Sequence, residues 1–139
     1  MKQTVATKAK QIDRQWHLVD AKGQILGRVA TRIAVLLMGK SKAYFVRHLD
    51  CGDYVVVVNA KDVAVTGKKL TQKIYTTYSG YPGGLRREAF RELLGRKPEE
   101  VVRRGVCGML PKNKLRDSMI KRLYIYSGEE HPHKDKFKM

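Results

Sequence analysis

Apolar residues recur at steps of three and four from Leu26 to Met38, which is the spacing of one face of an amphipathic helix. Gly39 follows at a position where helices commonly end. Residues 16–19 form a short strand candidate before this helix, and a polar, turn-like cluster at residues 20–23 separates the two. The pattern therefore predicts a strand followed by a helix over residues 26–38.

Residues 54–58 are one tyrosine and four valines, a β-branched run that does not alternate with polar residues. A strand that is apolar on both sides must be covered on both faces, which is typical of parallel sheets. Residues 63–66 form another short strand candidate a few positions later. Strand, helix and buried strand together predict a βαβ unit with a right-handed crossover.

The second half of the chain begins with an aromatic and glycine-rich segment. Residues 74–78 form an extended stretch with two tyrosines, and residues 79–84 hold three glycines and one proline, which predicts a loop. Helical spacing returns at Leu85, Ala89, Phe90, Leu93 and Leu94. We therefore expect a helix directly after the loop, ending at Gly95.

Two further helices and a last strand are predicted beyond this point. Pro98 suits the first turn of a helix, and Glu99 and Glu100 follow where the helix dipole favours carboxylates. Apolar positions among basic residues predict another helix over residues 115–123, and residues 124–126 form the final strand candidate.

The chain is strongly basic, with 29 Lys and Arg against 13 Asp and Glu in 139 residues, a formal net charge of +16. Such a charge predicts a polyanionic partner, above all nucleic acid. An anionic membrane surface is the alternative, and it would favour a basic amphipathic helix or a polybasic tail. Residues 68–122 carry a net charge of +10 and residues 123–139 are neutral, which disfavours a polybasic tail.

Length and composition predict a single soluble domain. We expect a basic N-terminal arm over residues 1–15, one α/β RNA-binding domain over residues 16–128 and a short polar tail over residues 129–139. No apolar run approaches the about 20 residues of a membrane helix, and residues 1–10 show no signal-peptide pattern. The two cysteines make no disulfide framework and fit a reducing compartment.

Motifs of enzymatic chemistry are missing from the sequence. The residues around Gly67 lack the spacing of a phosphate-binding loop, and residues 20–27 lack the dinucleotide-binding glycine pattern. Cys51, Cys107 and the four histidines include no closely paired zinc ligands, and no serine or cysteine lies in a nucleophile motif. We therefore expect no cofactor, no metal, no small-molecule substrate and no catalytic residue.

Basic, aromatic and glycine residues occur together in the second half. Tyr75, Tyr78 and Tyr81 lie near lysines and arginines, which neutralise phosphates, and aromatic rings can stack on unpaired bases. For any single tyrosine, half-buried packing is the more common role. The basic run over residues 112–122 contains one acid, Asp117, which favours a nucleic-acid surface over an ordinary solvated face.

Five motifs carry a resemblance to a known family, in order along the chain. They are residues 52–60 (GDYVVVVNA), 65–69 (VTGKK), 78–84 (YSGYPGG), 108–115 (GMLPKNKL) and 126–133 (YSGEEHPH). Through them the sequence resembles ribosomal protein thirteen of the large subunit, of bacterial or organellar type, from about residue 16 to residue 133. Cys51 and a short C-terminal tail are minor departures from the family pattern.

The resemblance implies a three-layer α/β/α fold around a small, mostly parallel four-stranded sheet, with a basic loop-and-helix extension. It also implies a structural constituent of the cytoplasmic or organellar large ribosomal subunit. Such a protein binds large-subunit ribosomal RNA, contacts neighbouring ribosomal proteins and supports early subunit assembly, without catalysis. A free regulatory binder of messenger RNA and, less favoured, a small RNA-modifying enzyme on the same scaffold are the alternatives.

The resemblance and the clustering of basic, aromatic and glycine residues together give a set of candidate RNA-binding residues. Most are cations or members of the glycine-rich loop, and two tail histidines join them as polar contacts rather than metal ligands. The candidates are Lys68, Lys69, Lys73, Ser79, Gly80, Tyr81, Gly83, Gly84, Arg86, Arg87, Lys112, Asn113, Lys114, Arg116, Lys121, Arg122, His131 and His133.

Overall fold

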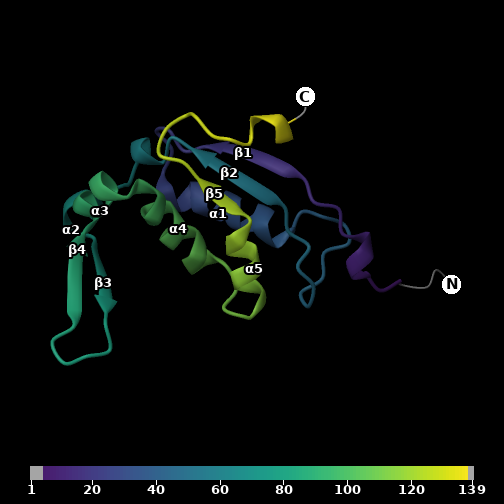
Figure 1. Cartoon of the computed structure of the whole chain (residues 1–139), viewed down its shortest axis with the longest axis horizontal. Coiled ribbons are helices and arrows are strands. Elements are labelled where there is room, and N and C mark those ends of the chain that lie inside the picture. Colours follow the sequence, from purple (N-terminus) through teal and green to yellow (C-terminus); the bar gives the residue numbers. More distant parts are fainter. Residues whose placement is uncertain (1–4, 138–139) are drawn as a thin grey trace.

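The computed structural model describes residues 5–137, which fold around a parallel three-stranded sheet (Figure 1). The strand order is β1-β2-β5, with bounds Trp16–Asp20, Tyr54–Val58 and Leu123–Ile125. A second, antiparallel sheet is the hairpin of β3 (Ile74–Tyr78) and β4 (Leu85–Ala89). The expected α/β class with a parallel sheet is confirmed.

Five α-helices accompany the strands in the described residues. Helix α1 lies between β1 and β2, helices α2 and α3 flank the hairpin, and α4 and α5 lead to β5 (Figure 1). None of them is long and apolar enough to cross a membrane. Their bounds are Leu26–Met38 for α1, Lys69–Gln72 for α2, Phe90–Arg96 for α3, Pro98–Met109 for α4 and Leu115–Lys121 for α5.

Strands β1 and β2 are parallel neighbours joined through α1, as the sequence pattern predicts. Trp16 is in register with Tyr54, and Asp20 with Val58. The apolar face of α1 is buried, and Gly39 ends the helix with a left-handed φ of 72°, a conformation that glycine adopts without steric cost. The predicted helix over residues 26–38 is thus confirmed at both ends.

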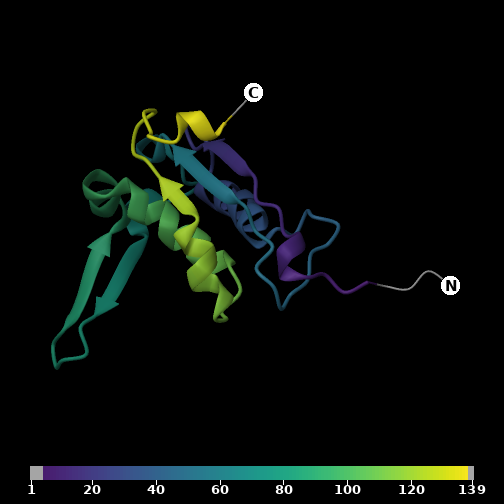
Figure 2. The ribbon, with the colours of Figure 1, turned by 45° about the vertical axis from the view of Figure 1, so that its right-hand side comes forward.

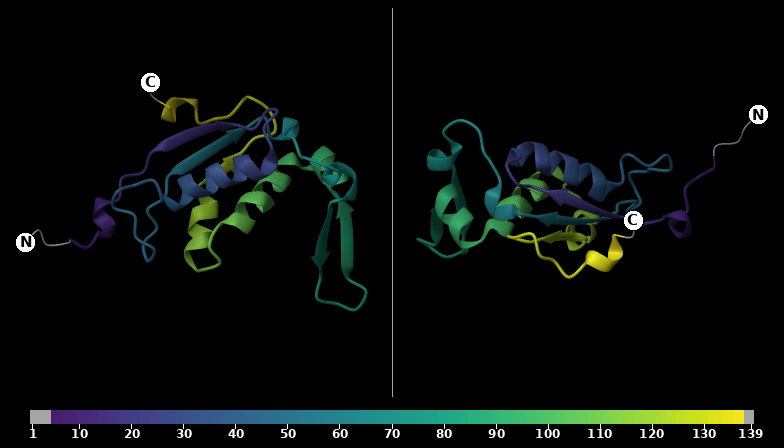
Figure 3. Two further views of the ribbon diagram at one scale, coloured as in Figure 1. Left: turned by 180° about the vertical axis from the view of Figure 1, so that it is seen from behind. Right: turned by 90° about the horizontal axis from the view of Figure 1, so that it is seen from above.

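The two faces of β2 are covered by different parts of the chain. Val55 and Val57 belong to the core that α1 and α4 complete, whereas Val58 lies beside the C-terminal segment of residues 129–134. Figure 3 shows the helices on one side of the sheet and the C-terminal segment on the other. An extended segment therefore takes the place that the three-layer expectation gave to helices.

Two predictions of local structure are wrong in detail. Residues 63–66 do not form a fourth strand: Ala64 makes a single parallel bridge with Ile25, because the chain leaves within a few residues for α2. The segment from Leu85 to Ala89 is strand β4, and the helix begins only at Phe90. A four-residue step lies on one face of a helix and also on one face of a strand, so the spacing alone was ambiguous.

Candidate nucleic-acid interface

The β3–β4 hairpin projects away from the body of the molecule (Figure 2). Its antiparallel register places Thr77 opposite Arg86 and Tyr75 opposite Glu88, so these four side chains share one face. Thr76 is in turn opposite Arg87, on the other face. The hairpin therefore carries cations on both of its faces.

The hairpin turn is the predicted glycine-rich loop. Gly80 and Gly83 have φ values of 87° and 73°, which side chains other than glycine rarely adopt. The Ser79 amide donates to the Gly84 carbonyl at 3.3 Å, and Tyr81 at the tip is 74% exposed. The turn thus presents bare backbone and one aromatic ring to solvent, which allows close approach to an RNA strand.

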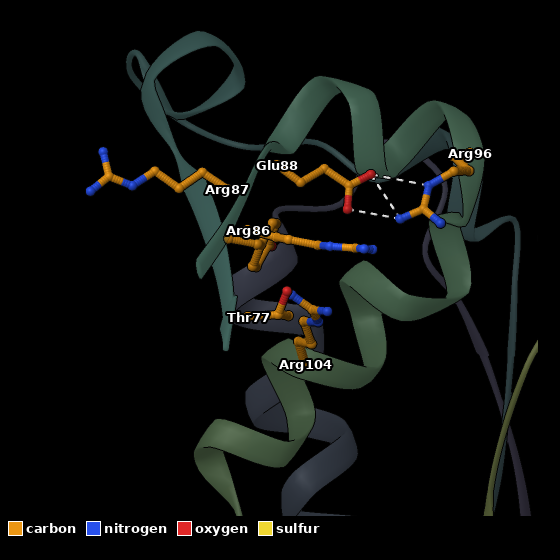
Figure 4. Close-up of a pocket in the computed structure, with 7 residues that line it drawn as sticks. Thr77, Arg86, Arg87, Glu88, Arg96 and Arg104 are labelled. Atoms are coloured by element: carbon orange, nitrogen blue, oxygen red, sulfur yellow. Dashed lines mark hydrogen bonds and ion pairs between the residues drawn. The ribbon is translucent and has the colours of Figure 1, made fainter. Parts of the chain in front are cut away.

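An arginine-lined cavity of about 430 Å³ lies between the hairpin and helices α3 and α4. Figure 4 shows Arg86 pointing from β4 toward the helices, and Arg104 from α4 lines the same cavity as Thr77 from β3. Arg87 points to the opposite side of the hairpin in the same view. The cavity therefore brings the predicted Arg86 together with two arginines that the sequence analysis had not selected, Arg96 and Arg104.

The cations of this cavity differ in how far they are already paired. Arg96 donates to both carboxylate oxygens of Glu88 at 2.8 Å, and Arg104 donates to Glu100 at 3.1 Å. Arg86 has no ion pair within the described part of the chain. Its guanidinium can bind a phosphate without breaking a pair, so Arg86 is the strongest RNA-binding candidate here.

Tyr75 connects the hairpin to the helices. The guanidinium carbon of Arg104 lies 5.1 Å from the centre of its ring, and the Phe90 ring lies 6.2 Å away. Burial raises the pKa of Tyr75, although the nearby Arg104 opposes the effect. Tyr75 is therefore a packing residue, which is the more common role anticipated for any single tyrosine.

The outer face of the hairpin is apolar and exposed. Ile74, Tyr78 and Leu85 have exposed fractions of 56%, 66% and 50%. Tyr78 and Leu85 are opposite each other in the register, so they form one continuous surface. With Arg87 on the same face, this surface offers both a stacking platform and a cation.

The lysines before the hairpin lie at its base. Lys68 and Lys69 are exposed at the start of α2, and Lys73 is half-buried where α2 meets β3. The Lys73 ammonium nitrogen lies 5.3 Å from the centre of the Tyr75 ring. Lys68 and Lys69 are thus free for phosphate, whereas Lys73 is already engaged in a cation–π contact.

The second predicted basic cluster lies in the loop between α4 and α5. Lys112, Asn113 and Lys114 are exposed, and Arg116 is half-buried in the first turn of α5. The Asn113 side chain accepts a hydrogen bond from the Leu115 amide, two residues on, at 3.1 Å and so orders the chain at the start of that helix. Helix α4, about 18 Å long, separates this loop from the base of the hairpin, so the structure gives two basic surfaces and not one.

Arg122 is not available to RNA, and its selection is corrected. The side chain is buried, and its guanidinium forms an ion pair with Asp50 and donates to the Leu37 carbonyl at 3.1 Å. Its neighbour Lys121 is exposed. The sequence places both in one basic run, but only Lys121 remains a candidate.

Asp53, a buried acid, connects the end of the loop between α1 and β2 to residues 15–17. It accepts hydrogen bonds from His17 Nε2 at 2.8 Å and from the Gln15 amide at 3.1 Å, and Lys42 Nζ lies 2.5 Å away. Burial alone would raise the pKa of Asp53, but these three donors together hold it below its ordinary value. The loop over residues 40–53 is therefore anchored by charge at its C-terminal end.

The tail histidines lie against the sheet and apart from the hairpin. The His133 ring is 5.2 Å from Trp16 and 4.6 Å from Tyr124, and His131 lies 6.0 Å from Tyr126. Packing is thus the role that these contacts assign to the histidines, while a contact to RNA stays a prediction. Within residues 5–137 no three His, Cys, Asp or Glu side chains are grouped to hold a metal ion.

Arg96 and Arg104 were missed because nothing in the sequence connects them with Arg86. Arg104 lies in a predicted helix, in which arginine is common on a solvated face, and Arg96 lies between two predicted helices. The sequence offered one signal, the step of four between Glu100 and Arg104, but it predicts a helix-surface ion pair and not a binding cavity. Only the fold of the hairpin onto α3 and α4 makes the cavity.

Comparison with known proteins gives a consistent result along nearly the whole chain. Residues 14–132 match the family described as ribosomal protein L13. The chain is 53% identical over 130 residues to the large ribosomal subunit protein uL13 of Dehalococcoides mccartyi, covering 94% of this chain and 91% of that protein. The uL13 proteins of Symbiobacterium thermophilum and Thermotoga maritima are 45% and 50% identical over 133 residues, with coverage of 96% of this chain and 93% and 89% of theirs.

Proposed function

Because the chain belongs to the ribosomal protein L13 family, we propose that it is a structural constituent of the large ribosomal subunit. In this role it binds large-subunit ribosomal RNA and contacts neighbouring ribosomal proteins in the cytoplasm. The family is structural and has no enzymatic activity, so the cations of this chain serve binding and not catalysis.

The observation that carries the RNA-binding proposal is the common direction of three projections. The hairpin tip, the loop between α4 and α5, and the loop between α1 and β2 all extend from the side opposite the C-terminal segment (Figures 1 and 2). Exposed cations lie on all three, including Arg86, Lys112 and Arg47. A rigid α/β body that presents separated cations on one side can bind adjoining RNA segments simultaneously.

The binding mechanism follows from this spacing. Lysine and arginine neutralise backbone phosphates and release counterions, which gives affinity that falls steeply with salt. The two basic surfaces, separated by α4, hold RNA segments that would otherwise repel each other. We infer that this neutralisation supports early folding of the RNA during subunit assembly, with shape rather than base sequence setting most of the fit.

The alternatives have less support. Binding of messenger RNA by the free protein would use the same features as the ribosomal role, so none of them favours it specifically. The relatives are named as subunit components. An RNA-modifying enzyme needs catalytic groups, and the family is a structural one. The ribosomal role is therefore the function proposed here.

Sedimentation of a cell lysate tests this function. The protein should co-sediment with large subunits at low salt and stay with them after washes that remove loosely bound proteins. An Arg86→Gln, Lys112→Gln, Lys114→Gln variant should be depleted from the subunit fraction, and a Lys134→Gln, Lys136→Gln control with changes only in the tail should not. Recovery of the wild-type protein free of large subunits would overturn the proposal.

A further inference from the structure

A hollow of about 340 Å³ lies between the loop after α1 and the segment that joins α4 to α5. It is separate from the arginine-lined cavity under the hairpin, and no candidate residue except Asn113 lines it. Both walls belong to the side from which the basic projections extend (Figures 1 and 2). Its size is in the range of small-molecule binding sites, which are commonly about 300–1,000 Å³.

The interior of the hollow is apolar and polarizable. Met38 comes from the end of α1, Phe45 and Leu49 from the following loop, and Met119 from α5. Two thioethers and one aromatic ring make favourable contacts with the face and edge of a flat aromatic ligand. Pro111 completes the wall without offering an amide donor.

The polar groups of the hollow are cations and one amide. Lys40 and Arg47 line it and are exposed, and Lys112 and Lys114 flank Asn113, the only side-chain amide in the lining. No lining residue is acidic. The nearest acid along the loop, Asp50, is already bound to Arg122, so the charge at the mouth of the hollow is uncompensated.

We propose that this hollow binds one unpaired nucleotide of RNA, with the base inside and its phosphate on Lys40 or Arg47. The proposal deepens the RNA-binding function and rests on it. The apolar interior favours a flat, uncharged group such as a base, and the cations at its mouth favour an anionic group, such as a phosphate, attached to it. A nucleotide combines both, and the Asn113 amide can both donate to and accept from a base edge.

A protein segment is the competing occupant of an apolar hollow. To bind here, such a segment would need an aromatic or aliphatic residue in the hollow and an adjacent acidic residue to pair with Lys40 or Arg47. An RNA strand supplies a phosphate with every base, and the neighbouring Lys112 and Lys114 continue the cationic track that a strand would follow. Charge complementarity therefore favours the nucleotide.

Methionine methyl signals provide a direct test, because two of the methionines line the hollow. The full chain, labelled with ¹³C at the methionine methyl groups, is titrated with adenosine and uridine 5′-monophosphates. Stacking of a base near Met38 and Met119 should shift their signals, while Met109, exposed elsewhere on α4, serves as an internal control. Ribose 5-phosphate, which has the sugar and the phosphate but no base, should leave the Met38 and Met119 signals unchanged.

Variants separate the base from the phosphate. Phe45→Ala should weaken nucleotide binding roughly tenfold, as expected for loss of one stacking partner. Arg47→Gln, at an exposed position, should weaken binding of the monophosphates but not of the uncharged nucleosides. Leu18→Ala, exposed on β1, is the control and should change neither. The dispersion of the amide spectrum confirms that each variant is folded.

Three results would overturn the proposal: no selective shift of Met38 and Met119, equal shifts at Met109, or a response only to the dipeptide acetyl-Asp-Phe. The last would assign the hollow to a protein partner. Sedimentation with large subunits tests the ribosomal role separately from the nucleotide site. A protein that co-sediments but shows no nucleotide response retains its ribosomal role and loses only this site.

Discussion

Glu88 on β4 accepts hydrogen bonds from Arg96 on α3 through both of its carboxylate oxygens, each at 2.8 Å. The pair fixes the hairpin to the helix that follows it, and it also places the single acid of the cavity lining on the same face as Arg86, in a cavity that Arg96 and Arg104 also line. An isolated surface pair of this kind contributes about 0–1 kcal/mol to stability. Its larger effect is on the charge that the cavity offers to RNA.

Replacing Glu88 with Gln should therefore strengthen RNA binding. The substitution frees Arg96 and raises the net charge of the cavity by one, so affinity for deproteinised large-subunit RNA should rise and its salt dependence should steepen. The free energy of unfolding should change by less than about 1 kcal/mol. Filter binding at several salt concentrations measures the effect, with Glu129→Gln in the tail as the matched control. Unchanged affinity would mean that RNA does not enter the cavity.

Arg122 and Lys121 form a matched pair for separating stability from binding. Arg122→Gln leaves Asp50 and the Leu37 carbonyl without their buried donor and should lower the free energy of unfolding by about 3 kcal/mol. Lys121→Gln changes an exposed neighbour and should alter stability by less than about 0.5 kcal/mol. Urea unfolding measures both, and equal stability of the two variants would contradict the buried role of Arg122.

The loop between α4 and α5 should account for part of the salt dependence. Replacing Lys112, Lys114 and Arg116 with Gln should weaken RNA binding and flatten the log–log salt slope by roughly one unit for each lost phosphate contact. Lys134→Gln with Lys136→Gln removes two charges on the opposite side and should leave the slope nearly unchanged. A slope that the loop variant does not alter would place the loop in solvent.

Acid should weaken the structure through Asp53. Its pKa is lower in the folded chain than the ordinary value of 3.8, so acidification favours the unfolded state, which binds the proton more readily. The stabilisation by Asp53 is complete above about pH 4 and is lost as the pH falls through the folded-state pKa. The difference in unfolding free energy between the wild type and Asp53→Asn should shrink between pH 5 and pH 2. A constant difference would contradict this role, and Asp135→Asn provides the control.

The sequence pattern predicted the central helix and strand well, because the positions of buried apolar residues follow the geometry of each element. Helix α1 and strand β2 have the bounds that the spacing of their apolar residues indicates. A basic surface was also predictable from the sequence, because the uncompensated positive charge over residues 68–122 favours a polyanionic partner independently of the fold.

The remaining features depend on contacts between residues distant in the sequence. Arg122 reads as one more cation in a basic run, and its burial depends on Asp50, 72 residues earlier in the chain. The cavity needs Arg86 from a strand and Arg104 from a helix, which meet only when the hairpin folds back. The tail histidines read as polar, and the sheet face under them makes them packing residues.

Lysine acetylation of intact large subunits, compared with the free protein, tests the central claim most directly. Lys68 and Lys69 at the base of the hairpin and Lys112 and Lys114 in the second basic surface are all exposed in the free chain. If these surfaces bind ribosomal RNA, mass spectrometry should show all four protected in the subunit, with Lys134 as a reference on the opposite side. Modification of the four lysines at the same rate in the subunit as in the free protein would contradict the account.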